Sequence, residues 1–89
     1  MARIRVKYLL WLRDKTGISE EVIVLPGSPS LEELIRIIMD KHLELRDLLK
    51  NLLGPDNPII ITVNGKTINR NIVLKDGDTV KLIPPVSGG

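Results

Sequence analysis

The spacing of apolar residues changes twice along this chain, from a period of two to a period near 3.6 and back again. From Arg3 to Trp11 the even positions are apolar or aromatic, while Arg3, Arg5 and Lys7 are charged, which is typical of a half-buried strand. Glu20 to Leu25 is rich in β-branched residues and predicts a second strand. Thr16-Gly17 lies between them and suits a turn, so the two strands should form a hairpin.

The middle of the chain has the period of a helix. Ser30, with Glu33 three residues later, forms a capping box, so a helix should begin at Leu31 and end near Lys41 or His42. Its apolar face has the i, i+3, i+4, i+7 spacing: Leu31, Leu34, Ile35 and Ile38.

A second apolar set repeats this spacing up to Gly54-Pro55, a strong stop pair; the set is Leu45, Leu48, Leu49 and Leu52. The leucine-rich stretch is therefore either a separate short helix or a long helical extension, and the sequence does not decide between them.

The last third returns to strands. Pro58 to Asn64 is followed by the turn pair Asn64-Gly65, by residues 66–68, by turn residues 74–78 and by a final strand from Thr79 to Ile83. A hairpin, a helix and further strands predict an α+β domain, with a mixed sheet of about five strands and one main helix on one face. This is the ubiquitin-like β-grasp arrangement. Residues 1–83 should form the domain and 84–89 an extended tail.

Composition excludes several classes of function. The chain has no Cys, so thiolate metal sites, disulfides and cysteine nucleophiles are excluded, and no metal site is expected. Its net charge is only +2 and the charges alternate in sign, which gives no reason to expect nucleic acid as a partner. No apolar run is long enough to cross a bilayer, so we expect no membrane partner and a cytoplasmic location.

Four motifs resemble the small subunit of molybdopterin synthase, which is grouped with the thiazole-pathway sulfur carrier and the archaeal ubiquitin-like modifiers. They are Tyr8 to Asp14 with Gly17, Val63-Asn64, Leu74 to Val80, and the terminal Pro84-Pro85-Val86-Ser87-Gly88-Gly89. The tail is the most specific of the four, and the resemblance covers nearly the whole chain.

The resemblance implies that Gly89 reacts through its terminal carboxylate. A ubiquitin-activating-type adenylyltransferase would adenylate it with ATP and Mg, and a sulfur donor protein would displace AMP to leave a thiocarboxylate. The large subunit of molybdopterin synthase would then receive the sulfur for a molybdopterin precursor. This chain would bind no cofactor and would not be catalytic alone. Transfer of sulfur to tRNA and isopeptide attachment to lysines, as by a ubiquitin-like modifier, are the alternatives.

Elementary chemistry supports this use of the tail. A free carboxylate is ionised at neutral pH and is a poor electrophile, and the chain has no phosphate-binding loop to activate it. Gly88 and Gly89 lack β-carbons, so the walls of a narrow partner channel can approach their backbone. Pro84 and Pro85 should make a stiff stalk, and Val86 can fill a partner pocket beside Ser87.

We also expect a docking surface on the open face of the sheet. If the even residues of the first strand face the helix, Leu9 and Trp11 point the other way, and the same alternation places Ile60 and Ile83 there. The first and last strands of a β-grasp sheet are parallel neighbours, so these residues should meet beside the tail. Alternatively, Leu9 or Trp11 lies under residues 43–53.

Three polar residues are not assigned a chemical role. His42 is the only histidine and is expected at the surface near a helix end. Asp76 and Asp78 flank Gly77 and are expected to be turn residues instead of metal ligands.

Overall fold

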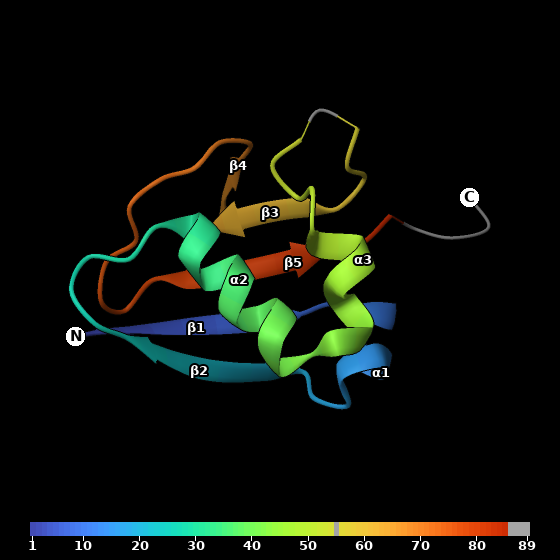
Figure 1. The fold of residues 1–89 in the computed structure, drawn as a ribbon, viewed down its shortest axis with the longest axis horizontal. Helices are drawn as coiled ribbons and strands as arrows, with labels where there is room; N and C mark the ends of the chain where they lie inside the picture. Colours follow the sequence, from blue (N-terminus) through green and yellow to red (C-terminus); the bar gives the residue numbers. More distant parts are fainter. Residues whose placement is uncertain (55, 86–89) are drawn as a thin grey trace.

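A mixed sheet and a main helix form two layers in the computed structural model, which describes residues 1–54 and 56–85 (Figure 1). The elements are β1 (Ala2–Tyr8), α1 (Trp11–Thr16), β2 (Glu20–Leu25), α2 (Leu31–Lys41), the 3₁₀ turn η1 (Leu43–Leu45), α3 (Arg46–Leu49), β3 (Ile60–Val63), β4 (Lys66–Ile68) and β5 (Thr79–Ile83). This is the predicted α+β arrangement, with α2 lying across one face of the sheet.

The first and last strands lie side by side at the centre of the sheet. The strand order is β2-β1-β5-β3-β4, in which β1 and β5 are parallel and the other neighbours are antiparallel. Val6 of β1 is opposite Val80 of β5, and Tyr8 is opposite Leu82. The predicted parallel pairing is therefore confirmed, and it brings the end of β1 to the end of β5.

The core lies between the sheet and α2. Ala2, Ile4, Val6 and Tyr8 are buried, as the period of two predicted for β1. On α2 the four apolar residues of the predicted face, from Leu31 to Ile38, are buried as well. Ser30 Oγ accepts a hydrogen bond from the Glu33 N–H at 3.1 Å, which satisfies one free amide of the first turn.

The leucine-rich stretch forms separate short elements and does not extend α2. His42 has φ −128°, which ends the helix before η1 and α3 begin. Leu45 and Leu49 are fully buried, so this segment closes one end of the core near α1 (Figure 1). The sequence had left this choice open.

One strand prediction is wrong. The first strand ends at Tyr8, and the following residues turn into α1, so the predicted hairpin carries a helical turn between its strands. Leu10 is 53% exposed and has φ 53°, while Leu12 is fully buried. The Leu12 N–H donates to the Leu9 carbonyl at 3.1 Å, which closes the turn. Residues 9 to 12 are all apolar, so their pattern fits a strand and a helix equally.

The second hairpin is as predicted. Asn64 and Gly65 have φ 52° and 86°, the left-handed pair that a tight two-residue turn requires. Asp78 accepts hydrogen bonds from the Asn64 side-chain amide at 2.9 Å and from the Lys75 N–H at 2.8 Å. Asp76 accepts one from the Arg3 N–H at 2.8 Å. Both aspartates thus serve as turn residues, as the sequence indicated.

Leu10 offers a test of the backbone strain before α1. Leu10 combines φ 53° with ψ −131°, a positive-φ conformation that costs a residue with a β-carbon about 1–3 kcal/mol and that glycine adopts readily. We expect Leu10→Gly to unfold with a free energy about 1 kcal/mol higher than Leu10→Ala, measured by chemical denaturation. The control pair is Arg13→Gly and Arg13→Ala within α1, where the alanine variant should be the more stable. If alanine is the more stable variant at position 10 as well as at position 13, the Leu10 backbone is not strained.

Candidate functional site

The candidate site is the base of the C-terminal tail, where β5 ends at Ile83. Pro84 is buried and Pro85 is exposed. Neither proline has a backbone N–H, so β5 pairing cannot continue through donors at these positions. Val86, Ser87, Gly88 and Gly89, which the sequence assigned to the reacting end and its partner contacts, lie outside the described residues.

Ile60 and Ile83 lie where the alternation predicted. They are opposite each other on β3 and β5, immediately before Pro84. Ile60 is 47% exposed and Ile83 is half-buried, whereas their neighbours Ile61 and Leu82 are in the core. The structure therefore presents an apolar pair on the open face beside the tail.

Leu9 and Trp11 reach the same end of the sheet by another route. The expectation that strand alternation places Trp11 on the open face is wrong, because β1 has ended at Tyr8 and Trp11 begins α1. The Leu9 N–H donates to the Leu82 carbonyl at 3.2 Å, so Leu9 stays beside β5. Trp11 is the first residue of α1, is half-buried, and packs against the hydrophobic core.

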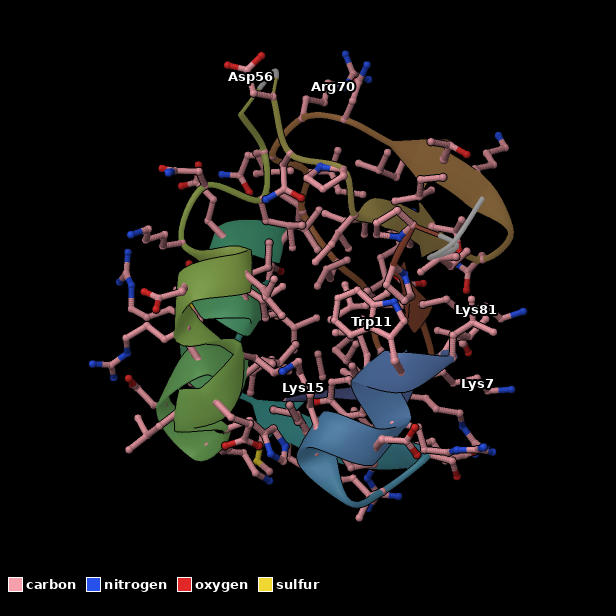
Figure 2. All side chains as sticks on the ribbon, turned by 90° about the vertical axis from the view of Figure 1, so that its right-hand side faces the viewer. Lys7, Trp11, Lys15, Asp56, Arg70 and Lys81 are labelled. Atoms are coloured by element: carbon pink, nitrogen blue, oxygen red, sulfur yellow. The ribbon has the colours of Figure 1, made fainter. Side chains whose placement is uncertain are left out.

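The Trp11 side chain contacts the tail directly. Its Nε1–H donates a hydrogen bond to the Pro85 carbonyl at 3.2 Å. Figure 2 looks onto this end of the molecule, with Trp11 near the centre of the view. The sequence placed Trp11 near the tail but gave no sign of this bond, since the two residues are far apart in the chain.

Positive charges border this end of the sheet. Lys7 and Lys81 are opposite each other in the parallel β1 and β5 pair, and their side chains extend on the same side in Figure 2. Lys15 Nζ lies 6.0 Å from the centroid of the Trp11 ring. The lysine pair was missed in the sequence, although the alternation that selected Ile83 also places Lys7 and Lys81 on the open face. Such charges favour an acidic partner surface.

A polar network fixes the end of β1 just before this site. Glu21 accepts a hydrogen bond from the Tyr8 hydroxyl at 2.6 Å and pairs with Lys41 Nζ at 2.7 Å. His42 Nε2 lies 2.7 Å from the same carboxylate, and the His42 ring contacts Tyr8 edge-on at a centroid distance of 5.4 Å. His42 is therefore half-buried within this network, so its expected surface position is wrong. The network joins β1, β2 and the end of α2.

The network changes the acidity of its members. Burial would raise the pKa of Glu21, but hydrogen bonds from Lys41, Tyr8 and His42 outweigh burial and lower that pKa from 4.5 to about 2. Burial, followed by the hydrogen bond to Glu21, raises the pKa of Tyr8. Glu21 is therefore an anion and Tyr8 a neutral donor throughout the physiological range.

Across residues 1–54 and 56–85, no three His, Cys, Asp or Glu side chains are grouped so that they could hold a metal ion. None of the helices in the same described segments has the length and apolarity needed to cross a membrane.

The Glu21 network predicts an acid-dependent loss of stability. A folded-state pKa of about 2 against 4.5 means that the ionised carboxylate stabilises the fold above pH 4.5, and this contribution is lost as the pH falls towards 2. We expect Glu21→Gln to lower the free energy of unfolding by about 2–3 kcal/mol at pH 6. The difference from the unchanged chain should nearly vanish at pH 2, as measured by denaturation at each pH.

Glu20→Gln is the matched control. Glu20 pairs with Arg5 at 2.9 Å, but both side chains are largely exposed, at 42% and 53%. This change should alter stability by less than about 1 kcal/mol. An equal effect of the two substitutions at pH 6 would contradict the role of the network.

Comparison with known proteins places this geometry in a family. The model of the ThiS family matches residues 6–89. A Chlamydomonas reinhardtii protein named molybdopterin synthase sulfur carrier subunit is 31% identical over 98% of this chain and 99% of its own length. A Pyrococcus furiosus structure described as molybdopterin converting factor subunit 1 has a TM-score of 0.84 and 32% identity, covering 97% of this chain and all of its own.

Two further structures extend the comparison. One is a complex of subunits 1 and 2 of the molybdopterin-converting factor of Helicobacter pylori; the matching chain has a TM-score of 0.65 and 27% identity, covering 98% of this chain and 99% of its own. The other is small archaeal modifier protein 1 of Methanosarcina acetivorans, with a TM-score of 0.75 and 29% identity, covering 100% and 98%. These matches confirm the β-grasp fold and the resemblance seen in the sequence. Since the family model spans nearly its whole length, the chain belongs to the ThiS family.

Proposed function

We propose that this protein is a sulfur carrier for molybdopterin synthesis and that Gly89 carries the sulfur as a C-terminal thiocarboxylate. The observation that carries the proposal is the Pro84 to Gly89 sequence, which follows the central strand β5 in a chain that matches an algal sulfur carrier subunit end to end. In this proposal partner proteins bind the β-grasp domain, and the tail reacts in their active sites.

Activation of the tail requires a partner enzyme. A carboxylate becomes an electrophile when its oxygen attacks the α-phosphate of ATP and pyrophosphate leaves. A ubiquitin-activating-type adenylyltransferase would supply ATP, Mg and the catalytic residues. Sulfide-level sulfur delivered by a donor protein then attacks the acyl carbon and displaces AMP, so that the net change at Gly89 is one oxygen exchanged for sulfur. The need for ATP is consistent with a cytoplasmic location.

The open face beside the tail is proposed as the docking surface. The exposed Ile60 and the half-buried Ile83 form an apolar pair, Leu9 adjoins β5, and Trp11 borders them from α1. A partner that covers this surface also receives the tail, because Pro84 follows Ile83 directly. The two-subunit complex from Helicobacter pylori supports a large subunit of molybdopterin synthase as one such partner.

A protein modifier is the second candidate. The Methanosarcina acetivorans match at 29% identity is to a small archaeal modifier protein. An acyl adenylate at Gly89 can be attacked by a lysine amine as well as by sulfur, which would give an isopeptide bond. Sulfur transfer to tRNA would use the same activated tail.

Intact mass spectrometry of the protein from its native cells, without reductant, tests the proposal. Exchange of oxygen for sulfur adds about 16 Da at the C-terminus. Finding this mass supports sulfur carriage, and its absence together with lysine conjugates supports the modifier. Reconstitution of the thiocarboxylated chain with a large synthase subunit and precursor then identifies the acceptor.

Changes at the last two glycines should abolish transfer without affecting the fold. Deleting Gly89 moves the terminal carboxylate back by one residue. Gly88→Val adds a bulky side chain where the walls of the partner's channel must approach the tail. We expect thiocarboxylate formation to fall by at least about 100-fold in each variant. The thermal midpoint should be unchanged, because a terminal tail contributes little to the core. Normal sulfur transfer by either variant would refute the mechanism.

A further inference from the structure

We propose that Trp11 is a positioning residue that holds the base of the tail and sets where residues 86–89 begin. The proposal rests on the proposed function, in which the tail enters a partner channel. It is carried by the hydrogen bond from Trp11 Nε1–H to the Pro85 carbonyl at 3.2 Å.

Within the protein, the tail base can be hydrogen-bonded only by a donor from outside its two prolines. Pro84 and Pro85 have no N–H groups, so only their carbonyls can join hydrogen bonds, and they can do so only as acceptors. Trp11 supplies a donor to the second of these carbonyls. The indole N–H of a half-buried Trp also needs an acceptor, so the pairing satisfies both groups.

The local fold directs the indole towards the tail. Leu10, with φ 53° and ψ −131°, turns the chain from β1 into α1, and Trp11 is the first helical residue. The Leu9 N–H to Leu82 carbonyl bond keeps this turn beside the end of β5. The Trp11 ring packs against the core, which limits its rotation. The donor is therefore held in place by rigid elements before a partner binds.

The consequence concerns the start of the tail. With the Pro85 carbonyl held by Trp11, the backbone at the base of the tail has less conformational entropy to lose when a partner binds it. Because Trp11 would act through the tail, its substitution should change the KM for adenylation and leave kcat unchanged.

The first experiment measures the bond itself, without any sulfur chemistry. Trp11 is the only Trp, so its indole N–H gives a single, unambiguous NMR signal. A chain that ends at Pro84 lacks the acceptor, and a chain that ends at Val86 keeps it. We expect indole hydrogen exchange to be about fivefold faster in the shorter chain and unchanged in the longer one. Equal exchange in both chains would overturn the proposal.

The second experiment measures the effect on activation. Trp11→Phe keeps an aromatic ring but removes the donor, so the KM for adenylation by the activating enzyme should rise about two- to tenfold, while kcat stays the same. Lys66→Gln, at the end of β3 and β4 that lies away from the tail, should leave both constants unchanged. An unaltered KM in Trp11→Phe, or an equal fall in kcat, would overturn the positioning role.

A third comparison separates positioning from direct contact with the partner. In chains that end at Pro84, Trp11→Phe should weaken binding of the domain to the activating enzyme less than it does in the full chain, because the loss that comes from the anchored carbonyl is absent. An equal weakening with and without the tail would show that Trp11 acts only through direct contact with the partner, and would overturn the proposal. If the unchanged full chain is not adenylated at all, the proposed function fails, while the exchange experiment still decides whether the bond exists.

Discussion

The parallel pairing of β1 with β5 is the interaction on which the rest of this structure depends. It joins the two ends of the sequence at the centre of the sheet, with Tyr8 opposite Leu82. The tail therefore leaves the domain beside the residues that follow β1, and the short helix α1 lies next to its base. A sheet in which β5 lay at an edge would separate Trp11 from Pro85 and remove the lysine pair from the open face.

One face of the sheet forms the core of the domain, and the other face carries the proposed docking surface. The face of the sheet under α2 is closed by aliphatic residues, and the polar network of Tyr8, Glu21, Lys41 and His42 joins the layers at one margin. The other face keeps an apolar pair and two lysines beside the tail. Because the core lies on the opposite face of the sheet, the side chains of the open face are available to bind a partner.

Most of the architecture could be predicted from the sequence because periodicity and turn chemistry agree with each other. The capping box at Ser30, the Asn64-Gly65 turn and the alternation in β5 all lie where the pattern placed them. The prediction failed where four consecutive apolar residues follow Tyr8, since a continuous apolar run carries no period. It also failed for His42, which contacts the carboxylate of Glu21 on β2, 21 residues away in the chain.

The sequence by itself determined the order of the strands and of the main helix, and the core faces of β1, α2 and β5, since these depend on local spacing and turn chemistry. The proposed role of the tail also rests on the sequence of the last six residues. Tertiary structure alone decided that Trp11 donates to Pro85, that Lys7 lies beside Lys81, and that Glu21 collects three donors. Each of these contacts joins residues distant in the chain. Their distances depend on strand register and on the exact end of β1, which no local pattern specifies.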